Sequence, residues 1–170
     1  MRMANRAYLF SADRADAWKL PDEDYYDSRW TIPLAWFFFF RPENIQMVGL
    51  GGSHWEECKL SGEKQTCLES FASRQPLLLS LIGDYPTREM IAKFAATVED
   101  RPGLLLMMDP GEVLGGIGQR DESDAKMFAR ILCLLDSGEA VREAMSLYVG
   151  QLSQDPGKRE CQVIGYTYCY

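Results

Sequence analysis

The sequence predicts an α+β fold in which one small mixed β-sheet is packed by several helices. Strand-like segments occur near the start, in the middle and at the end of the chain, at residues 6–11, 104–108 and 161–168. Helical patterns lie between them, and this order is typical of a sheet covered by helices. The chain has 170 residues and is 46% hydrophobic, which suits one domain with a core of its own. We therefore expect residues 1–170 to form a single globular domain.

The first half of the chain contains two predicted strands separated by a loop and an aromatic run. Residues 6–11, Arg-Ala-Tyr-Leu-Phe-Ser, have the composition of a strand. Residues 12–31 are polar and rich in turn-forming residues, so we expect a loop there. A second short strand is predicted at residues 45–50, just before a pair of glycines.

Five consecutive aromatic residues, Trp36 to Phe40, stand between these strands. The apolar segment is too short to span a bilayer, which takes about 20 residues, so it must be buried in the core or against another protein. Thr31 can cap a helix that has Pro33 in its first turn, and Pro42 would end it. Phenylalanine also suits strands, but these bracketing residues favour a short buried helix.

The second half is predicted to be mainly helical around one central strand. The run of leucine and methionine at 104–108 is typical of a strand covered on both faces. A break is expected at Pro76, and residues 77–82 form either a helix or a buried strand. Residues 154–157, Gln-Asp-Pro-Gly, suggest a turn before the last strand at 161–168. Helices are predicted at residues 61–74, 87–96, 121–135 and 139–152.

Composition excludes some classes of function. A formal net charge of −7 and a pI near 4.8 argue against non-specific binding to nucleic acid or to anionic membranes, which requires a basic face. They allow a basic protein partner. The five cysteines contain no Cys-x-x-Cys pair, so we expect no disulfide framework, no structural zinc and no cofactor. The first residues carry no apolar signal segment, which predicts a cytoplasmic protein.

Few residues suggest catalysis. His54 is the only histidine, and Asp109 follows the predicted central strand with Glu112 close by. Carboxylates at strand ends often act in α/β enzymes, so a small enzyme that uses Asp109, Glu112 and His54 is the alternative function. Asp109-Pro110-Gly111 is also typical of a simple turn. We assign no catalytic or metal-binding residue.

Two acidic patches are the stronger candidates for a binding site. Residues 11–27 carry six carboxylates and two cations, and aromatic residues are interleaved with them. Tyrosine and tryptophan often anchor protein interfaces, although these aromatics could instead fold back onto the core. The second patch opens the helix predicted at 121–135. The candidate partner-binding residues are Trp18, Asp22, Glu23, Asp24, Tyr25, Tyr26, Asp27 and Trp30 in the first patch, and Asp121, Glu122 and Asp124 in the second.

The N-terminal block Met3-Ala-Asn-Arg-Ala-Tyr-Leu-Phe-Ser11 and the later Ile32-Pro33-Leu34 segment resemble a group of bacterial proteins of unknown activity. Members of this group begin with Met-Ala-Asn-Arg-x-Tyr-Leu-Tyr-Ser, so Phe10 replaces a tyrosine here. They are similar to the immunity proteins that accompany polymorphic or contact-delivered toxins. The resemblance covers about the first 45 residues and transfers no catalytic residue.

The leading hypothesis from the sequence is therefore an immunity protein that binds and occludes a cognate bacterial toxin. The toxin is expected to be a basic enzyme that acts on nucleic acid or a nucleotide, because such an enzyme needs a cationic surface for its substrate. An acidic inhibitor can imitate the charge of that substrate. Direct nucleic-acid binding and membrane insertion are not expected.

Overall fold

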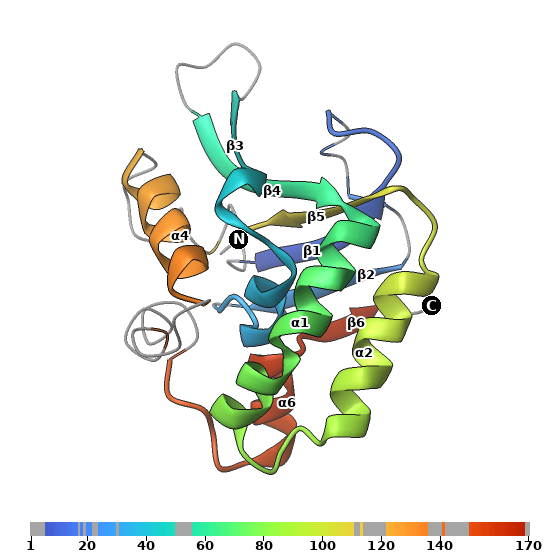
Figure 1. Ribbon diagram of the computed structural model, residues 1–170, viewed down its shortest axis with the longest axis vertical. Coiled ribbons are helices and arrows are strands. Elements are labelled where there is room, and N and C mark those ends of the chain that lie inside the picture. Colours follow the sequence, from blue (N-terminus) through green and yellow to red (C-terminus); the bar gives the residue numbers. More distant parts are fainter. Residues whose placement is uncertain are drawn as a thin grey trace, which may run out of the picture.

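The computed structural model describes residues 6–16, 18, 20–21, 24–29, 31–49, 56–110, 113, 122–135, 141 and 150–168. The predicted α+β class is confirmed: a six-stranded sheet is packed by helices (Figure 1). The strand order is β3-β4-β5-β1-β2-β6, and every described pairing is antiparallel rather than mixed. The strands are β1 (Arg6–Ala12), β2 (Tyr25–Arg29), β3 (Ile45–Gly49), β4 (Glu56–Glu63), β5 (Leu105–Asp109) and β6 (Tyr166–Tyr168).

Helices cover one face of the sheet, and the core lies between them and the strands. In Figure 1, α1 crosses the sheet, with α2 and α6 beside it. Leu9 and Met108 face each other across β1 and β5, and both are buried in the core. The helical elements are η1 (Leu34–Phe39), η2 (Pro42–Asn44), α1 (Lys64–Ile82), α2 (Arg88–Asp100), α4 (Glu122–Leu134) and α6 (Pro156–Val163).

The aromatic run forms the centre of this core. Its first four residues belong to a short 3-10 helix, η1, in which every side chain is buried, and Phe40 follows this helix and is buried as well. Phe39 stacks on Phe71 of α1 with ring centroids 4.4 Å apart, and Phe37 stacks on Phe128 of α4 at 5.7 Å. The predicted short buried helix is confirmed, and the run is core rather than interface. Thr31 does not cap it, because the N-cap position is occupied by Pro33; the Thr31 hydroxyl lies 3.1 Å from that of Ser28.

Several side chains donate hydrogen bonds to main-chain carbonyls and connect η1 and α1 to neighbouring segments. Trp36 Nε1 donates to the carbonyl of Ile164 at 2.7 Å. Arg74 of α1 donates to the carbonyl of Phe40 at 2.7 Å. The guanidinium of Arg159 in α6 donates to three carbonyls, those of Ile82, Tyr85 and Ser153. These bonds satisfy buried and partly buried carbonyl groups that would otherwise be costly.

Several predictions for the second half are confirmed. The strand expected at 104–108 is β5, which lies in the middle of the sheet between β4 and β1. Helix α2 begins after Thr87, whose hydroxyl accepts a hydrogen bond from the amide of Met90 at 3.3 Å. Helix α4 matches the helix expected from residue 121. The helix predicted at 139–152 falls largely outside the described residues.

Other predictions are wrong, and tertiary packing explains them. The loop expected at 12–31 contains β2, which is held between β1 and β6. The helix expected from Ser61 starts only at Lys64, because the preceding residues pair with β5 as part of β4. Pro76 does not end α1. A proline inside a helix costs about 3 kcal/mol, and burial of Phe71 and Ile82 on its two sides offsets that cost.

The C-terminal turn and strand were also placed incorrectly. Asp155 caps α6 by accepting a hydrogen bond from the amide of Lys158 at 2.9 Å, and Pro156 is the first residue of that helix. This is a favourable helix start, so the Asp-Pro-Gly segment forms a helix instead of the predicted turn. The last strand is correspondingly shorter and consists of β6 alone.

Candidate functional site

Two residues of the first acidic patch are buried in the fold. Tyr26 is 3% exposed, lies edge-to-face against Phe94 at 4.9 Å, and carries the guanidinium of Arg101 over its ring. Asp27 is 1% exposed and accepts a hydrogen bond from Arg6 at 2.8 Å. Burial raises the pKa of Asp27, against the opposing effect of the nearby arginines. Tyr26 and Asp27, which were expected to contact a partner, are thus buried in the fold, where their side chains are not accessible.

The remaining candidates of that patch are only partly placed. Asp24 is exposed and has a positive φ of 64°, which is tolerated by aspartate in turns. Tyr25 is half-buried against Tyr8, with ring centroids 5.9 Å apart, and Trp18 is half-buried with the ammonium of Lys59 5.2 Å from its ring centroid. The structure does not describe Asp22, Glu23, Trp30 or Asp121, nor the side chains of Glu122 and Asp124 in α4.

Asp109 belongs to a buried ion-pair cluster. Lys59 Nζ lies 2.6 Å from Asp109 Oδ2 and 3.4 Å from Glu57 Oε2, and the lysine side chain is only 7% exposed. A buried ammonium group needs such partners, because an unpaired charge in the interior is very costly. This role accounts for Asp109 without catalysis. The other two residues of the alternative enzyme site, His54 and Glu112, lie outside the described residues.

The cluster is part of a row of polar side chains that crosses the sheet on the face away from η1. Strand pairing places Gln46 opposite Lys59, Tyr8 opposite both Asp109 and Asp27, and Asp27 opposite Tyr166. Residues directly opposed across antiparallel strands point to the same face. Sequence reasoning missed this row, because these positions are far apart in the chain and only the strand register brings them together.

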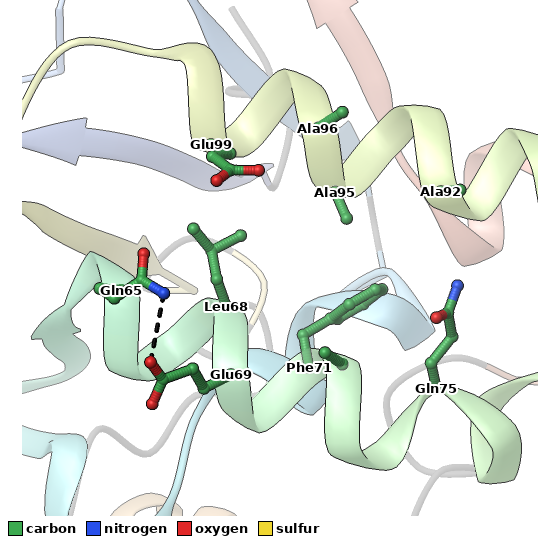
Figure 2. A pocket seen from close by; sticks show the side chains of 10 residues that line it. Gln65, Leu68, Glu69, Phe71, Gln75, Ala92, Ala95, Ala96 and Glu99 are labelled. Carbon is green, nitrogen blue, oxygen red and sulfur yellow. Dashed lines mark hydrogen bonds between the residues drawn. The ribbon is translucent and has the colours of Figure 1, made fainter.

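A groove between α1 and α2 is a candidate site for partner binding (Figure 2). Its volume is about 370 Å³. Leu68 and Phe71 point from α1 toward α2, and Ala95 faces them from the other side, so the floor is apolar. The further lining residues are Gln65, Glu69, Ala72, Gln75, Ala92, Ala96 and Glu99.

The rim of this groove is acidic. Glu69 and Glu99 are both exposed, and none of the described residues that line the groove is a lysine or an arginine. Gln65 Nε2 donates to Glu69 Oε1 at 3.2 Å, which orients that carboxylate. Lys64 directs its ammonium to the carbonyls of Glu99 and Arg101, at 3.1 and 2.5 Å. The groove therefore combines an apolar trough with carboxylates that are available to a cation.

Sequence reasoning did not find the groove. The helical pattern of α2 identified its buried residues, such as Phe94 and Val98, but gave no partner for the alanines on the adjacent side of that helix. Three alanines at positions 92, 95 and 96 were the available signal. Small side chains at neighbouring positions of a helix leave room for another group to approach.

Within the described part of the chain, no three histidine, cysteine or acidic side chains are grouped so that they could hold a metal ion. The helices of the same part include none with the length and apolar character needed to cross a bilayer.

In comparisons with protein-family models, curated proteins and solved structures, nothing matched the chain.

Proposed function

We propose that this chain is an immunity protein that binds and occludes a cognate bacterial toxin, and that the toxin is a basic enzyme acting on nucleic acid or a nucleotide. The observation that carries the proposal is the groove between α1 and α2, with its apolar floor and its two rim glutamates. The formal net charge of −7 supports it, because charge of this sign attracts a basic partner over a distance.

The groove matches the side chains that a basic enzyme presents. The aliphatic stem of a lysine or arginine can lie along the alanines of α2, while its charged end reaches Glu69 or Glu99. Hydrogen bonds between such cations and carboxylates are stronger than those between neutral groups. Occupation of the groove would engage the cations with which the toxin holds its anionic substrate, and the toxin would lose access to that substrate.

The groove alone is smaller than a complete interface. A stable protein complex usually buries about 800 Å² on each partner, and a few central residues supply most of the binding energy. We therefore assign the groove the role of central anchor, with the exposed sides of α1 and α2 forming the surrounding contact. Carboxylates at the edge of the contact would mainly accelerate association.

Charge reversal in the groove tests the proposal. The double variant Glu69→Lys and Glu99→Lys should weaken binding to the toxin encoded beside this gene at least tenfold, mainly through slower association at low salt. A matched control reverses Glu43 and Asp84, two exposed carboxylates outside the groove. Both doubles change the net charge equally, so the control should have a much smaller effect. Surface plasmon resonance at several salt concentrations measures both rates.

Three results would contradict the proposal. Equal weakening by both double variants would show that only the overall charge matters, and no weakening by the groove variant would remove the groove from the interface. Absence of any binding to the neighbouring toxin would contradict the immunity function itself. If neutralisation required turnover of a modified substrate, the chain would be a repair enzyme instead of an occluding inhibitor.

A further inference from the structure

A second pocket lies where the edge of the sheet at β2 and β6 meets α6. Its volume is about 450 Å³, which falls in the range of sites that bind small organic molecules. It is a separate feature from the groove between α1 and α2, because the two have no described lining residue in common. Its charge is also opposite in sign.

Among the residues that the structure describes, two cations and no carboxylate line this pocket. Arg29 comes from the end of β2 and Lys158 from the first turn of α6, and both are exposed. Within the part of the chain that the structure describes, neither forms an ion pair with a carboxylate. Asp27, two residues before Arg29, is buried and bound by Arg6. A cationic pocket in a chain of net charge −7 is suited to an anion.

Hydroxyl groups complete the polar side of the pocket. Ser28 is buried, and its Oγ lies 3.1 Å from Thr31 Oγ1, so one hydroxyl donates to the other. The accepting hydroxyl keeps its own proton and can donate it to a ligand oxygen. Ser153 adds a third hydroxyl from the opposite wall. Arginine, lysine and hydroxyl donors together form the usual surroundings of a phosphate group.

Tyr166 supplies an aromatic surface beside these donors. It lines the pocket and is 49% exposed, which is unusual among the aromatic side chains that the structure describes. Hydrogen bonding with Cys161 is the main cause that raises the pKa of Tyr166. The phenol therefore stays neutral at physiological pH, and much of the side chain remains accessible. Such a ring can stack against a planar ligand.

We infer that this pocket binds a phosphorylated aromatic small molecule of the size and class of a nucleoside monophosphate. The phosphate is held by Arg29, Lys158 and the free hydroxyl proton of the Ser28–Thr31 pair, and the base stacks on Tyr166. The inference is independent of the proposed immunity function, because it rests on other residues and on the opposite charge.

Isothermal titration calorimetry on the full chain at low ionic strength tests the inference, with adenosine monophosphate, adenosine and inorganic phosphate as separate probes. Adenosine monophosphate should bind at one site per chain and at least tenfold more tightly than either of the other two. The double variant Arg29→Gln and Lys158→Gln should weaken its binding at least tenfold. The matched control Arg88→Gln and Lys93→Gln removes the same charge from α2 and should change affinity less than twofold.

The contribution of stacking is tested with Tyr166→Leu, which should reduce the affinity for adenosine monophosphate to that for phosphate. Equal binding of phosphate and adenosine monophosphate by the wild type would refute the aromatic part of the inference. Equal binding of adenosine and adenosine monophosphate would refute the phosphate part. No saturable binding of adenosine monophosphate, or equal loss in the control variant, would refute the whole. These ligand comparisons use the wild-type chain, so they do not depend on the folding of any variant.

Discussion

Replacement of Phe39 by alanine should cause a large loss of stability, because this residue is central to the core. Phe39 is 0% exposed, stacks on Phe71 at 4.4 Å and lies edge-to-face with Phe94 at 5.7 Å. A buried phenylalanine replaced by alanine typically costs about 3–5 kcal/mol. Both aromatic contacts are lost as well, and such pairs add about 0.5–1.5 kcal/mol each. We therefore expect a loss in the upper half of that range, about 4–5 kcal/mol.

For a chain of this length, 1 kcal/mol corresponds to about 2–4 °C in Tm, so the Phe39→Ala variant should melt about 8–20 °C lower. Thermal melts and urea unfolding followed by circular dichroism measure both quantities. Leu104→Ala serves as the control, since Leu104 is 72% exposed and surface changes usually stay within about 0.5 kcal/mol. A Phe39→Ala variant that melts within 2 °C of the wild type, yet loses its partner, would refute the assignment of Phe39 to the core.

Three other predictions follow from charged and thiol groups. The Lys59→Met change should lower the free energy of unfolding in urea by up to about 3–5 kcal/mol. The loss should be smaller when Asp109 has already been replaced by asparagine, because Lys59 and Asp109 form one ion pair. For Asp27, burial raises the folded-state pKa above its ordinary 3.8. The titration of Asp27 therefore stabilises the folded state fully below pH 3.8, and this stabilisation is lost as pH rises through the higher folded-state pKa. The Asp27→Asn variant lacks this titration, so its free energy of unfolding minus that of the wild type should increase as pH rises from about 4. A difference that stays constant with pH would contradict this. Burial raises the pKa of Cys67 to about 12, so a thiol reagent at pH 8 should modify the exposed Cys133 in the folded chain and leave Cys67 unreacted, as peptide mass mapping would show.

Elements with strong local signals could be predicted from the sequence. The continuous apolar run of β5 and the amphipathic pattern of α2 each indicate one structure without reference to the rest of the chain. β2 lacks such a signal, since Tyr-Tyr-Asp-Ser-Arg carries polar residues at positions that prove to be buried. Pairing with β1 and β6 decides its conformation. At Asp155 and Pro156, the residues that favour a turn equally favour a helix start.

The candidate sites were harder to predict than the fold, because each depends on how distant segments meet. Glu69 and Glu99 are thirty residues apart, and they share a rim only because α1 and α2 pack side by side. Arg29 and Lys158 meet only because β6 pairs with β2 and brings α6 to that edge. Sequence reasoning instead selected the acidic residues that are concentrated in the sequence. One of them, Asp27, forms an ion pair with Arg6 within the fold.

The carbonyl-binding donors affect how freely this sequence can change over evolution. Trp36, Arg74 and Arg159 hold neighbouring segments through main-chain oxygens, which every amino acid possesses. Substitutions at the accepting positions leave these bonds intact wherever the side chain itself is not needed, whereas each donor is difficult to replace. A few donor residues thus determine the path of the segments whose carbonyls they bind. The other residues of those segments can change during evolution while the backbone keeps its conformation.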